Sequence, residues 1–204
     1  MSEDEITFKI ITVGESGVGK TSIFRRYVYS TFEENTLSTL GLQFSFKDVI
    51  LKNKQKIKLR LIDTAGEEKY KSLSKSYFKN ADVVLFVFAL DKPDTFEQIN
   101  TWINLFKENH DKVDKIPKYL IGNKNDLEQK VEQGKIDELT KKLCYKYIST
   151  SALSNNNIEY LFNDISETVF KAYKPDKIQQ TIKLKHKTNY NNKKAKCSSC
   201  LVEK

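Results

Sequence analysis

Residues 14–21 have the residue types needed to hold a chain of phosphates. They read Gly14-Glu15-Ser16-Gly17-Val18-Gly19-Lys20-Thr21. Glycines let successive backbone N–H groups point at phosphate oxygens, and the N-terminus of a following helix adds positive potential. Lys20 would place its ammonium on the terminal phosphates, and Thr21 would offer a hydroxyl to Mg²⁺. The pattern predicts nucleoside triphosphate binding but leaves kinases, ATPases and GTPases open.

A second polar segment, Asn123-Lys124-Asn125-Asp126, follows the short apolar run 118–122. Guanine presents two adjacent donors, N1–H and the 2-amino group, and one carboxylate can accept from both. Adenine has an acceptor at N1, so the same carboxylate would lose a buried pairing, and such sites discriminate by about 10⁴-fold or more. Asp126 is therefore a candidate for selecting guanine. Taken alone, this tetrapeptide could equally be a polar turn.

The segments that must position these residues alternate between strand and helix patterns. Apolar and β-branched runs predict strands over 6–13, 42–51, 57–63, 82–90, 118–122 and 145–149, the second and third forming a hairpin. Helical spacing predicts helices from about 20 to 29 and over 94–109, 131–144 and 157–173. This order predicts an α/β fold with a mostly parallel six-stranded sheet and helices on both faces. Residues 123–126 then follow a strand at the carboxyl edge of the sheet, where such folds place their ligands.

Charge is concentrated at the C-terminal end. The segment from Lys174 onward contains nine lysines and two acids, Asp176 and Glu203. It therefore carries 9 − 2 = +7 of the formal net charge of +8. We expect one α/β domain over 5–173 and a disordered basic tail over 174–204. The tail lacks aromatic residues apart from Tyr190, so it does not indicate nucleic-acid binding. The acidic N-terminus and the lack of a run of about 18 apolar residues argue against a secretory signal and a membrane span.

The three cysteines do not form a disulfide framework, because their number is odd and two crowd at the end; a reducing cytosolic compartment fits better. Cys197 and Cys200 are candidates for lipidation, although four residues follow Cys200 where the simple prenylation box has three. Free thiols or half a zinc site remain alternatives, but no second cysteine pair completes such a site. Cys144 is expected to pack in the core, and His110 and His186 are expected to be solvated.

Together these motifs resemble the Ras superfamily, and the Rab family most closely, over roughly residues 6–173. The resemblance is carried by GESGVGKT at 14–21, Thr39-Leu40-Gly41, DTAGEE at 63–68, YFKNA at 77–81, NKND at 123–126, TSAL at 150–153 and Trp102. It implies the Ras-like P-loop fold, binding of GTP and GDP with Mg²⁺, and GTP hydrolysis. A small nucleotide kinase fits the phosphate loop alone, because the other motifs and the lack of an arginine-rich lid do not suit it.

The resemblance also implies a role for each matching residue. Thr21 and Thr39 would ligate Mg²⁺, with Asp63 acting through water, and Gly66 would donate its N–H to the γ-phosphate. Phe32 would lie against the base, and Ala152 would offer its N–H to the guanine carbonyl. The implied nucleotide-binding set is Glu15, Ser16, Gly17, Val18, Gly19, Lys20, Thr21, Ser22, Phe32, Thr39, Gly66, Asn123, Lys124, Asp126, Ser151, Ala152 and Leu153, and the implied catalytic set is Lys20, Gly66 and Glu67.

Glu67 departs from the family, since it stands where a glutamine orients the attacking water. A glutamine amide both donates and accepts, whereas an ionised glutamate only accepts. A like charge at about 4 Å from phosphate costs roughly 4 kcal/mol at an effective dielectric of about 20. We therefore expect slow hydrolysis, or a replacement group supplied by a partner, and a scaffold that stays bound to GTP is the alternative function. Alternatively, Glu68 or solvent compensates, or a raised pKa of Glu67 restores a donor.

The resemblance finally implies partners and a location. A monomeric switch would recruit effectors in vesicle traffic and would need an exchange factor and a GTPase-activating protein. It would sit on the cytosolic face of an endomembrane through its lipidated tail. Its effector surface would include Phe44, Ile62 and Tyr77, with Ile62 standing where Rabs usually carry tryptophan.

Asp91, Asp94 and Glu97 are interpreted as acids at a helix start.

Overall fold

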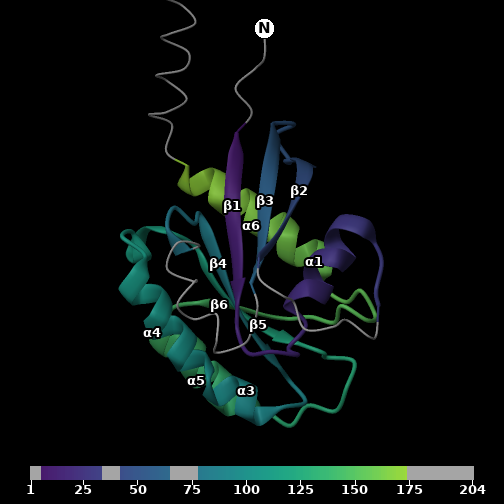
Figure 1. Cartoon of the computed structure of the whole chain (residues 1–204), viewed down its shortest axis with the longest axis vertical. Helices are drawn as coiled ribbons and strands as arrows, with labels where there is room; N and C mark the ends of the chain where they lie inside the picture. The colour runs from purple at the N-terminus through teal and green to yellow at the C-terminus, as the bar shows by residue number, and fades with distance from the viewer. Residues whose placement is uncertain (1–5, 34–41, 65–77, 174–204) are drawn as a thin grey trace, which may run out of the picture. The chain divides into compact units, whose positions relative to one another are not determined.

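The computed structural model describes residues 6–33, 42–64 and 78–173, and it confirms the predicted α/β fold. Six strands form one sheet in the order β2-β3-β1-β4-β5-β6, antiparallel between β2 and β3 and parallel elsewhere (Figure 1). The strands are β1 Thr7–Val13, β2 Leu42–Ile50, β3 Lys56–Thr64, β4 Val83–Ala89, β5 Lys118–Asn123 and β6 Lys146–Ser149. The helices are α1 Lys20–Tyr29, α3 Pro93–Glu97, α4 Ile99–Asn109, η2 Val113–Lys115, α5 Gln133–Leu143 and α6 Ile158–Ala172.

Helices cover both faces of the sheet, which explains why β4 is buried along its whole length. On one face, α4 packs Trp102 and Phe106 into a cluster with Phe86 and other residues of the central strands. On the other face, α1 and α6 meet where the rings of Tyr27 and Phe162 stack with centroids 3.8 Å apart. Two hydrophobic layers therefore hold β1 and β4, the strands that lead into the site.

The predicted helix over 94–109 is two helices. It breaks at Gln98, between α3 and α4. Thr95 occupies the start of α3, where its hydroxyl donates to the Lys92 carbonyl at 2.7 Å and accepts from the Ala89 N–H at 3.1 Å. The short helix is thus tied to the end of β4, and α4 packs on the sheet separately.

Two predictions about single residues are wrong. Cys144 is exposed, because it is the left-handed residue (φ 53°) that ends α5 and lies beyond the buried side of that helix. His110 is buried rather than solvated: it packs against Phe106, and its Nε2 lies 3.1 Å from the Ala81 carbonyl oxygen. The Lys112 N–H donates to His110 Nδ1 at 3.2 Å, so the Nε2 nitrogen carries the proton donated to Ala81.

Several other predictions fall outside the described residues. They concern Thr39, Gly66, Glu67, Tyr77 and the tail, including Cys197, Cys200 and His186. By contacts, the chain divides into a unit of residues 1–169 and a second unit of residues 170–204. In the part of the chain that the structure describes, no helix is both long and apolar enough to span a membrane.

Candidate nucleotide-binding site

The loop between β1 and α1 has the form of a phosphate cradle. Gly19 is the N-cap of α1 in a left-handed conformation (φ 93°), and no side chain of the described residues caps the N–H groups of the first turn. A Cβ atom at Gly19 would lie 2.3 Å from Asn123 Nδ2, so only glycine fits there. The uncapped N-terminus and its partial positive charge suit an anion. Around the loop, Ser16 and Gly17 are exposed, Glu15 and Ser22 are half-buried, and Val18 is buried.

Lys20 lies in this cradle, and among the described residues its ammonium forms no ion pair with a carboxylate. It is only 5% exposed, and its ammonium donates to the carbonyls of Gly14 at 3.0 Å and Glu15 at 2.8 Å. Burial lowers the pKa of Lys20 to about 8, although the charges of Asp63 and Glu15 raise it. A buried cation held mainly by carbonyl oxygens is what a bound phosphate would stabilise.

Thr21 and Asp63 form a second polar pair beside the loop. The Thr21 hydroxyl donates to Asp63 Oδ2 at 2.5 Å, while Oδ1 of the same carboxylate is buried and accepts no hydrogen bond from the described residues. Burial raises the pKa of Asp63, and the Thr21 hydrogen bond and the charge of Lys20 lower it. A cavity of about 390 Å³ between α1 and β2–β3 reaches both side chains. One hydroxyl and one carboxylate beside a phosphate cradle fit Mg²⁺, which is usually held together with substrate phosphates.

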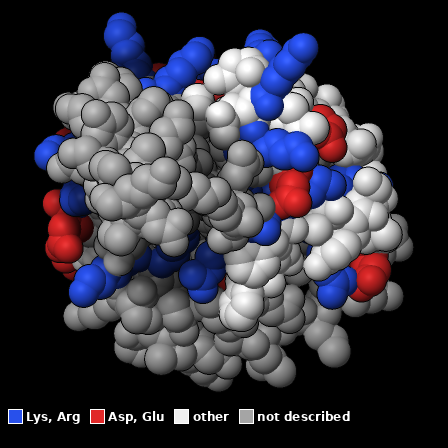
Figure 2. Space-filling view, turned by 90° about the horizontal axis from the view of Figure 1, so that it is seen from above, with Lys and Arg blue, Asp and Glu red and all other residues white. Residues whose placement is uncertain are grey.

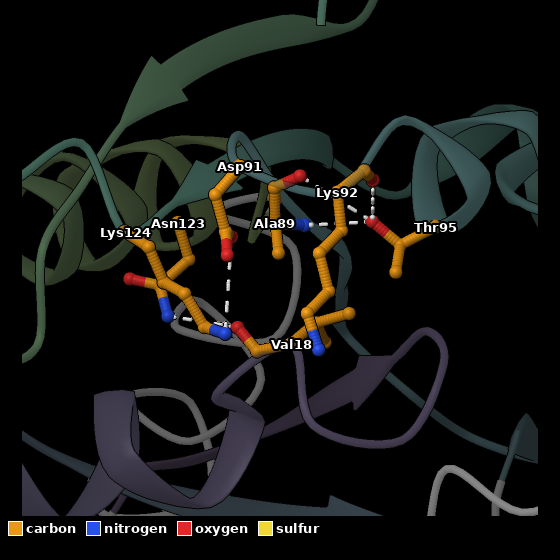
Figure 3. Close-up of polar contacts among 7 residues, drawn as sticks. All are labelled: Val18, Ala89, Asp91, Lys92, Thr95, Asn123 and Lys124. Carbon is orange, nitrogen blue, oxygen red and sulfur yellow. Dashed lines mark hydrogen bonds and ion pairs between the residues drawn. The ribbon is translucent and has the colours of Figure 1, made fainter. Parts of the chain in front are cut away.

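Asn123 joins the phosphate loop to the second motif (Figure 3). Its side chain is 2% exposed, and Nδ2 donates to the Val18 carbonyl at 2.8 Å. Its Oδ1 accepts from the Thr150 hydroxyl at 3.2 Å. The Asn125 N–H in turn donates to the Thr150 carbonyl at 3.0 Å. The structure thus brings residues 14–21, 123–126 and 150–153 together at the carboxyl edge of the sheet, the edge predicted for residues 123–126.

The expected base-binding residues lie around this junction. Lys124 has φ 67°, and its ammonium is 3.8 Å from Asp91 Oδ1 (Figure 3). Asp126 is exposed. Ser151 and Ala152 are buried, and Leu153 is 48% exposed. The carboxylate proposed to select guanine is therefore accessible from solvent, while the residues around it are held by the fold.

Four residues outside the predicted nucleotide-binding set support the site: Trp102, Arg26, Thr150 and Asp91. The indole of Trp102 donates to Glu15 Oε1 at 2.8 Å. Arg26 donates to the carbonyls of Ala152 at 2.8 Å and Leu153 at 3.0 Å, and its guanidinium lies 5.8 Å from the ring centroid of Phe32. Thr150 holds Asn123, as described above. These contacts position the phosphate loop, residues 14–21, and residues 150–153, which we call the base loop.

Asp91 is the fourth, and it corrects an interpretation. Its interpretation as an acid at a helix start is wrong, because α3 begins only at Pro93 and Asp91 faces Lys124 instead. Glu97 likewise ends α3, so only Asp94 lies in its first turn.

The predicted effector surface is only partly supported. Phe44 is 59% exposed and lies beneath the Arg60 guanidinium, which is 5.6 Å from its ring centroid. Ile62 is only 2% exposed and packs in the core cluster that includes Ile11 and Phe78, so its assignment to a partner-contacting surface is wrong in this structure. Ile62 is buried because other elements cover both faces of β3 from Leu61 to Thr64.

Comparison with known proteins agrees with this geometry. The model of the Ras family matches residues 9–171. Ras-related protein Rab-11B of Dictyostelium discoideum is 37% identical over 90% of this chain and 82% of its own length. Ras-related protein RabC of the same organism is 36% identical over 87% of this chain and 91% of its own length. Ras-related protein Rab-13 of Bos taurus is 32% identical over 79% of this chain and 79% of its own length. The chain therefore belongs to the Ras family of small GTPases, as a divergent member of its Rab branch.

Proposed function

We propose that this GTPase is a GTP/GDP switch that recruits effector proteins to an intracellular membrane in vesicle traffic. The observation that carries the proposal is the Asn123 side chain, which ties the phosphate loop at Val18 to the base loop at Thr150. A single buried amide thus holds in one place the elements that would grip the two ends of a guanine nucleotide. This is the coupling that a nucleotide-dependent switch needs.

The described residues have distinct tasks in binding and hydrolysis. The N-terminus of α1 and Lys20 would hold the phosphates, and Asp126 would accept the two donors of guanine. Thr21 and Asp63 would hold Mg²⁺, which would neutralise charge on the phosphates during transfer. Burial of Lys20 and Asp63 strengthens their electrostatic action, because the effective dielectric there is lower than in water.

The switch itself would lie in segments outside the described residues. We propose that Thr39 and Gly66 bind the metal and the γ-phosphate when GTP is present and release them after hydrolysis. Effectors would read that change next to Phe44, an exposed aromatic residue of β2, and Tyr77. An exchange factor and a GTPase-activating protein would set the two rates, and the protein would act as a monomer.

Membrane attachment would use the tail. Cys197 and Cys200 are the proposed lipidation sites, and the tail lysines would add attraction to an anionic leaflet. This attachment would place the protein at the cytosolic face of an endomembrane.

Glu67 supports an alternative, in which the protein holds GTP for long periods and works as a scaffold without useful turnover. An acceptor-only carboxylate near the phosphates disfavours the arrangement that a glutamine amide gives to the attacking water. The two functions differ in one rate, that of hydrolysis of bound GTP.

Single-turnover hydrolysis of GTP preloaded on the purified protein with Mg²⁺ tests both functions. We expect slow hydrolysis by the wild type and an acceleration of about tenfold in Glu67→Gln, because the amide restores a donor, a change of about 1.4 kcal/mol. Glu68→Gln is the matched control and should leave the rate unchanged, whereas a lower rate would support the alternative in which Glu68 compensates for Glu67. Equal rates in wild type and Glu67→Gln would remove the scaffold alternative, and failure to bind GTP would contradict both functions.

The pH dependence of GDP affinity follows from Lys20. With a pKa of about 8 in the free protein, Lys20 loses its proton above that pH, whereas bound phosphates keep it charged. Binding then requires proton uptake, so affinity falls as pH rises. Between pH 7 and pH 8.5 we expect a decrease of roughly fourfold. Isothermal titration in two buffers of different ionisation enthalpy measures both the affinity and the proton uptake; a constant affinity with no uptake would contradict this role of Lys20.

A further inference from the structure

The edge of the sheet where β3 and β5 begin is rich in lysine. The turn leading into β3 carries Lys52, Lys54 and Lys56, all exposed, and the segment before β5 carries Lys112 and Lys115. Figure 2 looks onto this edge and shows lysine and arginine side chains projecting around its described part. The nucleotide site lies at the opposite edge, where β1, β4 and β5 end. One edge thus presents exposed lysines, and the other presents the nucleotide site.

An exposed apolar residue stands among the lysines of the β2–β3 turn. Ile50 is 68% exposed and is paired with Lys56 in the antiparallel register. The turn is well formed, with the Lys54 N–H donating to the Leu51 carbonyl at 2.8 Å. We call Ile50, Lys52, Lys54 and Lys56 the turn surface. Lysines around an exposed apolar side chain match the interface of an anionic bilayer, which offers negative headgroups over an apolar interior.

Helix α6 runs to the same edge. The Lys52 N–H donates to Glu167 Oε1 at 2.9 Å, and the Tyr119 hydroxyl, from the start of β5, donates to Asp164 Oδ2 at 2.8 Å. Asp164 and Glu167 of α6 therefore lie at this edge, and Glu167 contacts the turn surface directly. After Ala172 the chain continues into residues 174–204, which carry +7 of the net charge and two cysteines.

We propose that the turn surface binds the anionic headgroups of a membrane and orients the GTPase domain upon it. This proposal rests on the proposed membrane role of the tail and adds a second contact, made by the folded domain itself. Because the turn surface and the nucleotide site occupy opposite edges of the sheet, the orientation leaves the site accessible to partners. Each lysine near an anionic leaflet strengthens binding by about fivefold.

Vesicle co-sedimentation of the full, unlipidated chain tests the proposal. The vesicles are phosphatidylcholine alone or with phosphatidylserine, at an ionic strength where charges are not fully screened. The variant Lys54→Glu/Lys56→Glu removes two lysines from the turn surface. Its matched control, Lys92→Glu/Lys130→Glu, makes the same change in net charge with exposed lysines that follow β4 and β5 at the other edge.

We expect the turn variant to bind phosphatidylserine vesicles about thirtyfold more weakly and the control to change less than threefold. Equal losses in both variants would overturn the proposal, because they would show attraction by net charge alone. No loss in the turn variant would overturn it as well, because the tail would then account for all binding. Neither result depends on GTP hydrolysis, so a failure here leaves the proposed switch function standing.

A second measurement reads the orientation. Ile50→Trp places an indole in the turn surface, and Leu127→Trp places one at the other edge, where Leu127 is 48% exposed. The natural Trp102 is buried and serves as a constant background. With brominated lipids in the anionic vesicles, we expect quenching of the indole at position 50 and not at position 127. Quenching at 127 but not at 50 would overturn the proposed orientation.

Discussion

Alanine at Gly14 is expected to prevent stable folding, whereas alanine at Gly17 in the same loop is expected to cost only about 1 kcal/mol. A Cβ atom at Gly14 would lie 2.1 Å from the carbonyl oxygen of Val87 and 3.1 Å from its carbon. Both are backbone atoms of β4, the strand that pairs with β1 just before the loop. Moving them would break the central parallel pairing, so the clash cannot be relieved by turning a side chain.

Backbone conformation adds to this penalty. Gly14 has φ +148°, a region that residues with a side chain rarely adopt. Gly17 has φ +73°, but a Cβ atom there would meet nothing within 4 Å. The loss at Gly14 should exceed about 4 kcal/mol, which is a large part of the 5–15 kcal/mol that stabilises a typical domain.

Urea unfolding followed by circular dichroism measures both variants against the wild type. Gly17→Ala is the matched control, because it makes the same substitution three residues away without the clash. The structure of the loop would be contradicted if Gly14→Ala unfolded within about 1 kcal/mol of Gly17→Ala.

The contrast between Gly14 and Gly17 also shows what the sequence could predict. The glycines of the phosphate loop are recognisable because the chemistry of phosphate binding requires them at fixed spacing. The six strands were likewise predictable, since β4 is a continuous apolar run and β2–β3 is a hairpin with a polar turn. Local patterns of this kind need no knowledge of distant residues.

The contacts that Trp102 and Arg26 make in the site could not be predicted, because they join residues far apart in the sequence. The hydrogen bond from Trp102 to Glu15 joins residues 87 positions apart, and that from Arg26 to Ala152 joins residues 126 apart. No local pattern marks such partners. Trp102 reads as one more apolar residue on the buried side of α4, and Arg26 reads as a charge on α1. The burial of Ile62 is similar, because it depends on which elements cover β3.

Asn123 shows both kinds of information in one residue. The sequence identifies the motif that contains Asn123. It does not identify the hydrogen-bond partner of Asn123, because the Val18 carbonyl lies 105 positions earlier in the chain. The amide satisfies two groups at once. Nδ2 donates to the carbonyl of the phosphate loop, and Oδ1 accepts from the Thr150 hydroxyl of the base loop. Phosphate and base binding should therefore depend on each other through this side chain.

We expect Asn123→Ala to release bound GDP about 100-fold faster than the wild type, a loss of about 2.7 kcal/mol in the bound state. Alanine leaves the Val18 carbonyl and the Thr150 hydroxyl without their buried partner, and each such group costs about 1–3 kcal/mol. Displacement of a fluorescent GDP analogue by excess GDP, with Mg²⁺ present, measures the release rate.

Two further variants decide whether the bridge to the phosphate loop is the cause. Asn125→Ala removes the same amide two residues later, where its contacts with Ser149 and Asn156 are long, 3.4 Å and 3.5 Å, and should change release less than threefold. Asn123→Asp keeps an acceptor for Thr150 but replaces the donor to Val18 with an oxygen, so it should release GDP at least as fast as Asn123→Ala. If Asn123→Asp instead retained GDP like the wild type, the bond to Val18 would carry little of the coupling, and the contact with Thr150 alone would hold the two loops together.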